Sequence, residues 1–272
     1  MPNDYENFNG SDMNNSQNYN QYYNQNYYSS QNTTNSYQYA SGPVVTSNPY
    51  SQTMRYSMKD VMSRTFLYMT IALLLTAISA MAVYTTNPYF LVTNGMSTFI
   101  ILAIVEVGVV IGASFAVKAN NAFLAGVLFV IYSIVNGLTL SVILLVYTEA
   151  SIAKVFFLTA GLFGVMAVMG FTTNRDLTSM GSLLMIGLFG IIIGSLINLF
   201  LHSTGLDYFI TIAGIAIFLG LTAYDTQKIK HIAMNNPGYS LSTIALYGAI
   251  ELYLDFINLF LKLLRLLGKA RN

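Results

Sequence analysis

The amino-acid sequence contains no cysteine, and it has only two histidines among its 272 residues. The absence of thiols excludes disulfide bonds, thiolate metal sites, iron–sulfur clusters and a cysteine nucleophile. The sequence also lacks the G-x-x-x-x-G-K-[ST], G-x-S-x-G and H-E-x-x-H patterns, so it carries no signature of a P-loop pump or of the corresponding hydrolases. We therefore predict that the chain is not an enzyme and has no cofactor.

Charged residues are scarce as well. They make up 8% of the chain, whereas about a quarter is usual in a soluble domain. Hydrophobic residues make up 54%, and the mean hydropathy is +0.55. With so few charges to keep a surface hydrated, the composition predicts that most of the chain is embedded in a lipid bilayer. The net charge of +1 offers no basic surface for nucleic acid.

The N-terminal part of the sequence has a different composition. Residues 1–54 consist mainly of Asn, Gln, Tyr and Ser and have almost no aliphatic side chains. Such a segment cannot bury enough apolar surface to offset the entropy lost on ordering. We predict a disordered cytoplasmic tail over residues 1–54. Its interleaved Tyr and Asn/Gln residues are also typical of segments that self-associate weakly.

Seven long apolar runs follow the tail. They cover residues 61–84, 97–117, 122–147, 153–173, 181–201, 208–224 and 241–267. A helix needs about 20 apolar residues to cross the hydrocarbon core of a bilayer, and continuous rather than alternating runs favour helices over a β-barrel. The sequence therefore predicts an all-α membrane protein, with a seven-helix transmembrane domain over residues 55–272. Glycines recur within the runs and are expected to let helices approach closely; examples are Gly161, Gly164, Gly190, Gly194, Gly214 and Gly220.

The distribution of basic residues predicts the orientation of the chain. Seven basic residues lie on one side of the membrane if every run crosses it, namely Arg55, Lys59, Arg64, Lys118, Arg175, Lys228 and Lys230. The opposite loops contain only Lys154, so the positive-inside rule places the N-terminus in the cytoplasm. The basic C-terminal segment, residues 262–271, disagrees with this count. Either the last run is re-entrant, or it crosses and places these residues outside; its 27 residues, about 40 Å of helix, favour a crossing.

Four carboxylates interrupt the apolar runs, and an ionisable residue inside a membrane span is costly enough to suggest a function. They are Glu106, Asp225, Glu251 and Asp255. Glu251 and Asp255 are four residues apart, so they share one face of a helix. No Lys or Arg stands in the middle of a run to pair with these groups. We therefore expect them either to share protons or to line a hydrated cavity that admits a cation.

The ligand types narrow the choice of cation. Carboxylate and amide oxygens are hard ligands suited to Ca²⁺ or Mg²⁺, whereas zinc prefers His and Cys. Two intramembrane aspartates also raise the alternative of an aspartyl protease with a shared proton. Neither Asp225 nor Asp255 is flanked by glycine, which argues against the tight loops expected of that chemistry.

Two segments resemble the signature sequences of the Bax inhibitor-1 family. They are GLTAYDTQKIK at 220–230 and ALYGAIELYLDFINLFLKLLRLLG at 245–268, supported by VEVGVV at 105–110, NGLTLSVI at 136–143 and NRDLTSMG at 174–181. The resemblance covers residues 55–268 and implies a seven-helix fold in which the last helix is central. Bacterial members are similar to a pH-sensitive calcium leak that is gated by an aspartate in each of the last two helices.

Carried over by motif, the resemblance assigns this pH switch and Ca²⁺ site to Asp225 and Asp255. Glu106 matches the family's glutamate in the second helix. The arginine that latches the first aspartate in the bacterial leak has no counterpart here, and Lys118 is the nearest candidate for that role. Glu251 is a possible additional carboxylate of the same site.

Two functions are compatible with these features. The first is a pH-gated calcium leak in a bacterial plasma membrane, with Ca²⁺ and protons as its ligands and the paired aspartates as its switch. The second is a multi-pass regulatory protein that acts on a membrane protease or in a cell-death or stress pathway without transport. In that case the tail at 1–54 is expected to bind the protein partner.

Overall fold

The computed structural model describes residues 57–89, 93, 95–236 and 238–271. Its helices are α2 (Met58–Thr86), α4 (Gly95–Lys118), α5 (Ala122–Leu140), α6 (Ile143–Val146), α7 (Glu149–Thr172), α8 (Thr178–Leu201), α9 (Thr204–Asn235) and α10 (Leu241–Leu267). Within these residues, seven helical segments are long and apolar enough to cross a membrane, with α5 and α6 forming one of them. The predicted seven-helix domain is confirmed. The predicted disorder of residues 1–54 lies outside the described residues.

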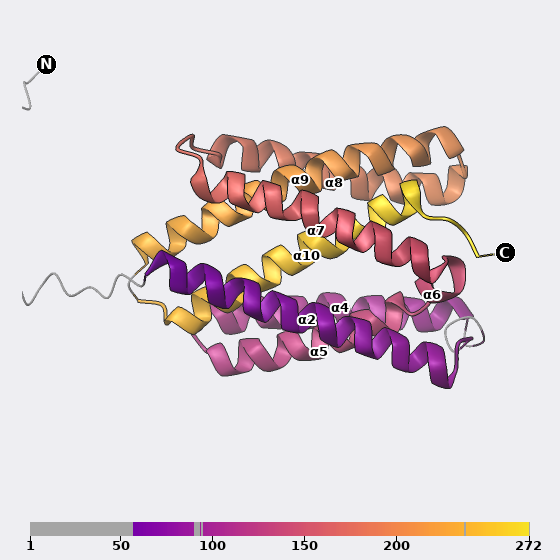
Figure 1. Ribbon diagram of the computed structural model, residues 1–272, viewed down its shortest axis with the longest axis horizontal. Helices are drawn as coiled ribbons and strands as arrows, with labels where there is room; N and C mark the ends of the chain where they lie inside the picture. The colour runs from indigo at the N-terminus through magenta and orange to yellow at the C-terminus, as the bar shows by residue number, and fades with distance from the viewer. Residues whose placement is uncertain (1–56, 90–92, 94, 237, 272) are drawn as a thin grey trace, which may run out of the picture. The chain divides into compact units, whose positions relative to one another are not determined.

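The long helices form two groups with α10 between them (Figure 1). In one group α5 packs against α2 and α4, and in the other α9 packs against α7 and α8. α10 packs against α2, α5, α7 and α9, which come from both groups. The prediction that the last helix is central is confirmed. It is central even though it carries two carboxylates, because most of its remaining surface is apolar and buried.

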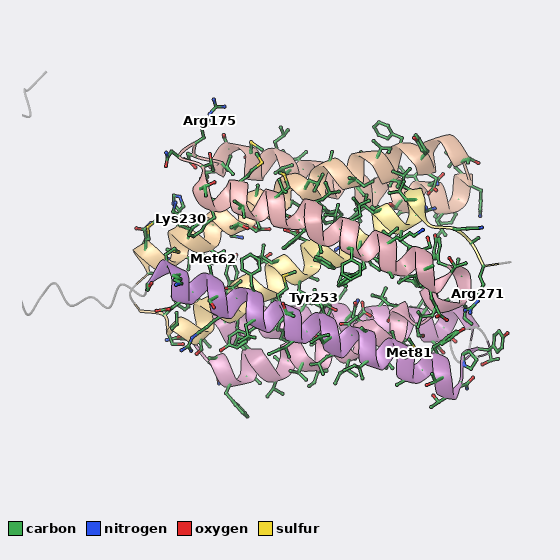
Figure 2. The ribbon with its side chains drawn as sticks, viewed as in Figure 1. Met62, Met81, Arg175, Lys230, Tyr253 and Arg271 are labelled. Atoms are coloured by element: carbon green, nitrogen blue, oxygen red, sulfur yellow. The ribbon has the colours of Figure 1, made fainter. Side chains whose placement is uncertain are left out.

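Small and aromatic side chains let α10 occupy this position. Ala245 and Ala249 are fully buried and leave room for the neighbouring helices. Tyr253, in the middle of the bundle (Figure 2), is also fully buried, and its ring meets Phe129 and Tyr132 edge to face at centroid distances of 5.5 and 5.6 Å. Such aromatic contacts add to the burial that stabilises the centre of the bundle.

The sixth transmembrane helix is longer than the apolar run indicated. We expected a span over 208–224 followed by a cytoplasmic loop, but α9 continues as helix to Asn235. The loop prediction was wrong because helical periodicity continues after hydropathy falls. Ile229 and Ala233 are four residues apart and both are buried, as expected of one helix face. At about 1.5 Å per residue, α9 is about 48 Å long and exceeds the hydrocarbon thickness of ~30 Å.

The loops between the helices lie at two opposite ends of the bundle, the near end and the far end. The near end contains residues 57, 119–121, 173–177, 236 and 238–240, and the far end contains 87–89, 147–148, 202–203 and 268–271. Figure 2 shows Arg175 and Lys230 at the near end and Arg271 at the far end. α10 is one unbroken helix from Leu241 at the near end to Leu267 at the far end. A re-entrant last span would need a reversal that this helix does not contain, so the structure supports seven crossings.

Both ends of α10 are tied to other parts of the bundle. At the near end, the Asn120 side chain accepts hydrogen bonds from Ser240 N and Thr243 Oγ1 at 3.0 and 2.8 Å. At the far end, the Arg271 guanidinium donates to Tyr84 Oη and to the Leu144 carbonyl at 2.6 and 2.8 Å. α10 is therefore anchored to the α4–α5 loop at one end and to α2 and α6 at the other.

The crossing number gives a testable prediction about topology. Reporters fused before Met1 and after Asn272 are expected to lie on opposite sides of the membrane, because α10 ends at the far end. The positive-inside count further predicts a cytoplasmic N-terminal reporter and an external C-terminal one. A paired phosphatase and fluorescent-protein fusion measures this directly. Two termini on the same side would contradict seven crossings.

Candidate functional site

Asp225 of α9 and Asp255 of α10 meet in the structure. The two residues are only 6% and 5% exposed, they line the same cavity, and each carboxyl group lies close enough to affect the electrostatics of the other. The two helices pack against each other along this stretch. The packing therefore brings together the two aspartates that the sequence singled out from separate motifs.

The aspartate pair lines a cavity of about 710 Å³ between α8, α9 and α10. α8 contributes apolar side chains to the lining, including Met185, Ile192 and Leu196. α10 contributes a polar row of residues spaced three or four positions apart, namely Glu251, Asp255, Asn258 and Lys262. This spacing places the row on one face of the helix, as predicted for Glu251 and Asp255. The cavity therefore has one apolar wall and one charged wall.

Lys228, from the end of the sixth apolar run rather than the middle of a run, supplies a cation to these carboxylates. Its Nζ lies 3.7 Å from Asp225 Oδ1 and 3.7 Å from Glu251 Oε1. It also lies over the rings of Tyr224 and Tyr247, at 5.8 and 5.2 Å from their centroids. The expectation that these carboxylates lack a basic partner was wrong. A signal was present in the sequence, because Lys228 follows Asp225 by three residues and so lies on the same helix face.

The loop at residues 173–177 shows how deep the aspartate pair lies within the bundle. Gln227 Nε2 donates to the Arg175 carbonyl at 2.8 Å, and Leu177 N donates to Gln227 Oε1 at 2.8 Å. Residues 173–177 connect two membrane-spanning helices, so Gln227 and Lys228 lie at the depth of a surface loop. Asp225 is three residues further into the helix than Lys228, about 5 Å deeper. The buried pair therefore lies just inside the near end.

The same loop has its own local order. Thr178 donates to Asp176 Oδ1 from its hydroxyl at 2.6 Å and from its backbone N at 2.9 Å. These two hydrogen bonds hold the pKa of the exposed Asp176 below its usual value. The ionised carboxylate stabilises the start of α8, where backbone N–H groups lack partners.

Glu106 lies in a separate polar cluster. Its carboxylate accepts hydrogen bonds from Thr139 Oγ1 at 2.6 Å and from Asn136 Nδ2 at 3.4 Å. Tyr253 Oη donates to Asn136 Oδ1 at 3.1 Å and contacts Thr76 Oγ1 at 2.6 Å. This cluster links α2, α4, α5 and α10. None of its members lines the cavity beside the aspartates, so the structure does not bring Glu106 to the pair.

Lys118 forms no ion pair with the aspartates within the described residues, and it does not line their cavity. Its Nζ lies 5.7 Å from the centroid of Phe115 on the same helix. The cation within 4.0 Å of Asp225 is Lys228. The basic residue that pairs with Asp225 therefore comes from α9 rather than from the end of α4.

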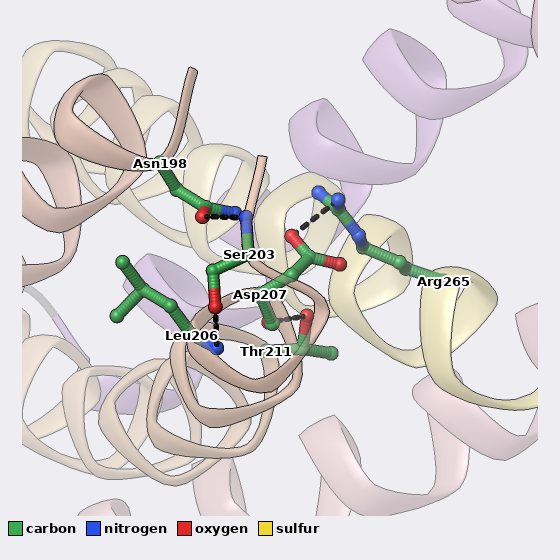
Figure 3. A network of polar contacts seen from close by, with 6 residues as sticks. All are labelled: Asn198, Ser203, Leu206, Asp207, Thr211 and Arg265. Atoms are coloured by element: carbon green, nitrogen blue, oxygen red, sulfur yellow. Dashed lines mark hydrogen bonds and ion pairs between the residues drawn. The ribbon is translucent and has the colours of Figure 1, made fainter. Parts of the chain in front are cut away.

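A second cavity of about 430 Å³ adjoins the first toward the far end. Ser195 and Leu199 of α8 line both cavities. Here Arg265 of α10 forms an ion pair with Asp207 of α9 (Figure 3). The two cavities together follow the charged face of α10 from Glu251 to Arg265.

The α8–α9 corner closes this second cavity with a short network of hydrogen bonds (Figure 3). Asn198 Oδ1 accepts from Ser203 N at 2.9 Å, and Ser203 Oγ accepts from Leu206 N at 3.4 Å. Thr211 Oγ1 donates to the Asp207 carbonyl at 2.9 Å. Ser203 thus caps the start of α9, and the corner is held in a defined conformation beside the Arg265–Asp207 pair.

The donors at the pair suit a weakly held hard cation. Within the described ranges, no group of three or more His, Cys, Asp or Glu residues converges on a common point. Asp225 and Asp255 offer carboxylate oxygens, and one oxygen, Asp255 Oδ2, is buried without a hydrogen-bond partner. Ca²⁺ takes six to eight oxygen ligands, so water would have to complete the shell. Such a site fits transient binding better than tight retention.

Known bacterial proteins are similar to this chain over most of its length. The family described as "Inhibitor of apoptosis-promoting Bax1" matches residues 58–272. The "Inner membrane protein YbhL" of Escherichia coli K12 is 41% identical over 229 residues, which are 80% of this chain and 94% of that protein. A Rickettsia prowazekii protein described as uncharacterized is 40% identical over 234 residues, 84% of this chain and 97% of its own length. A Borreliella burgdorferi protein, also described as uncharacterized, is 43% identical over 215 residues, 78% of this chain and 92% of its own length.

Proposed function

Because the chain belongs to the Bax inhibitor-1 family of multi-pass membrane proteins, we propose that it is a calcium leak channel gated by protonation of Asp225 and Asp255. One observation carries the proposal. Two carboxyl groups are buried against each other beside a cavity that follows the charged face of α10. Within the described residues the ion pair with Lys228 reaches Asp225 but not Asp255, whose Oδ2 is buried without a hydrogen-bond partner. A buried carboxyl group destabilises a fold unless it is paired or protonated, and this cost favours a functional role.

Protonation controls the pair through its charge. Two ionised carboxylates in a poorly hydrated site repel each other, so the contact between Asp225 and Asp255 requires at least one shared proton. The two groups then titrate as one unit. Loss of the proton adds a negative charge between α9 and α10 and favours a larger spacing. Since α10 lies between the two helix groups, a change in its spacing alters the width of the cavity.

Lys228 adds a second contact between the same helices. It pairs with Asp225 on its own helix and with Glu251 on α10. The side chains of Lys228 and Glu251 are each about one-third exposed. Solvent therefore screens the ion pair between them, and the pair contributes little to the stability of the helix contact. Lys228 would hold an ionised Asp225 in place, in the role that the sequence had assigned to Lys118.

The membrane and the orientation are part of the proposal. The Escherichia coli relative is named an inner membrane protein, which favours a bacterial plasma membrane. The basic residues near the start of α2 and in the loops of the near end favour a cytoplasmic near end. The regulatory alternative that depends on the tail at 1–54 stays a prediction, because that tail lies outside the described residues.

Purified protein in liposomes tests the proposal. We expect Ca²⁺ flux across the vesicle membrane to depend on pH between about pH 5 and pH 8, the range in which shared-proton carboxyl pairs and histidines titrate. Whether Ca²⁺ flux rises or falls with pH identifies which protonation state of the aspartate pair conducts. Flux that increases with pH would assign conduction to the ionised pair, and flux that increases with acid would assign it to release of the Lys228 contacts. Flux equal to that of empty vesicles at every pH would rule out the leak.

Glu251 provides a graded test of the site. Glu251→Gln removes the charge that binds Lys228 across the helices, but Glu251 is 34% exposed at its side chain whereas Asp255 is buried. We therefore expect Glu251→Gln to change the pH profile of flux less than a substitution of either aspartate. A profile flattened as strongly as in the aspartate variants would show that Glu251 belongs to the titrating unit.

A further inference from the structure

Lys262 is a charged residue of the cavity that the gating pair does not involve. It lies on the polar face of α10, seven residues after Asp255, and lines the same cavity. Seven residues are nearly two helical turns, about 10 Å along the axis. Lys262 therefore lies between the aspartate pair and the second cavity, on the far-end side of the site.

The position of its side chain is set by a glycine on the facing helix. A Cβ atom built on Gly214 of α9 would lie 3.1 to 3.3 Å from the Cγ, Cδ and Cε atoms of Lys262. The methylene chain of the lysine thus occupies the space that a larger residue at Gly214 would fill. This contact holds the stem of Lys262 against α9, and the residue lines the cavity.

The charge of Lys262 is not neutralised in the described part of the chain. No carboxylate oxygen there lies within 4.0 Å of its Nζ. Asp207, on the facing helix nearly two turns from Gly214 toward the far end, is paired with Arg265. A cation that passes along α10 between the far end and Asp255 therefore meets a positive charge that forms no ion pair in the described part of the chain.

We propose that Lys262 is a selectivity residue of the leak, an electrostatic barrier that slows divalent cations more than monovalent ones. This inference rests on the proposed function. The energy of an ion beside a fixed charge is proportional to the charge of the ion. The factor by which Lys262 slows Ca²⁺ is thus the square of the factor by which it slows K⁺. A steric obstruction would instead slow ions of similar size by similar factors, whatever their charge.

Lys262→Met tests the inference, because methionine is a similarly long, unbranched side chain without the charge. We expect K⁺ flux in liposomes to increase by about threefold and Ca²⁺ flux by roughly tenfold, as for a unit charge removed at ~10 Å in a partly hydrated site. Lys262→Arg keeps the charge and is expected to stay near the wild-type values. Lys154→Met, at an exposed lysine of α7 outside both cavities, is the matched control. Lys262→Gln removes the same charge if the methionine variant does not fold.

The outcomes separate this inference from the proposed function. Equal factors for K⁺ and Ca²⁺, or no change in either flux, would overturn the barrier while the wild-type leak remained. A Ca²⁺ flux that appears only in Lys262→Met would support a barrier strong enough to close the wild-type path. If neither the wild type nor the two uncharged variants carries Ca²⁺, both the leak and the barrier are overturned.

Discussion

Replacing either Asp225 or Asp255 by asparagine is expected to flatten the pH dependence of Ca²⁺ flux. Each carboxyl group is buried beside the other, so in the proposed switch the binding of a shared proton depends on both. Asparagine keeps the size and polarity of the side chain but cannot titrate. A coupling of only ~1.4 kcal/mol between two groups already displaces the midpoint of a titration by about one pH unit. Flux measured in liposomes from pH 5 to pH 8 reports the loss.

The double variant Asp225→Asn/Asp255→Asn is expected to resemble the single variants, because residues of one network are not additive. Asp176→Asn is the matched control, since Asp176 lies exposed in the α7–α8 loop at the same end of the bundle. Helical content near the wild-type value must accompany each flux measurement. The paired switch is contradicted if both single variants keep the wild-type profile, or if their separate effects add in the double variant.

Gly170→Ala is expected to lower the free energy of unfolding by about 3 kcal/mol, the upper part of the range for overpacked sites. A Cβ atom at Gly170 would lie 2.1 Å from the Ala223 carbonyl oxygen and 2.8 Å from the Ala223 Cα. A backbone cannot move aside as a side chain can, so α7 and α9 would have to separate. Because Ala223 is two residues before Asp225, the same shift would also disturb the contact between Asp225 and Asp255.

Gly164→Ala provides the comparison on the same helix. No atom of the described chain lies within 4 Å of a Cβ at Gly164, so alanine there has space and a slightly better helix propensity. Thermal unfolding in detergent, followed by circular dichroism, is expected to show a Tm lower by about 10 °C for Gly170→Ala and unchanged for Gly164→Ala. Equal losses in both variants would mean that glycine flexibility rather than close packing matters on α7.

These two glycines also show that the presence of glycine in an apolar run does not by itself predict close helix packing. The sequence predicted that the glycines of the apolar runs allow close helix packing. Gly214 and Gly220 do lie against side chains of neighbouring helices, but Gly161, Gly164 and Gly190 have no described atom within 4 Å. For these three, packing within the described part of the bundle was the wrong interpretation. Which side of a helix faces a neighbour depends on its rotation, and a run that is apolar all round does not encode that rotation.

The sequence alone determined the membrane class and the seven spans, and it singled out four intramembrane carboxylates, from which the family resemblance selected Asp225 and Asp255. Each of these depends on a local property: the length of an apolar run against the thickness of a bilayer, or the free-energy cost of a carboxylate within such a run. The family resemblance added the central position of the last helix. None of these inferences required knowledge of which residues face one another.

Tertiary structure alone decided how the charged residues are grouped. Glu106 and Asp255 are both intramembrane carboxylates by sequence, yet packing places one with Thr139 and the other with Asp225. Lys228 was counted as a loop residue, but α9 remains helical there and carries it to Asp225 and Glu251. A charge in a membrane protein is compensated by whatever group lies within a few ångströms, and that distance is set by the rotation, length and neighbours of whole helices.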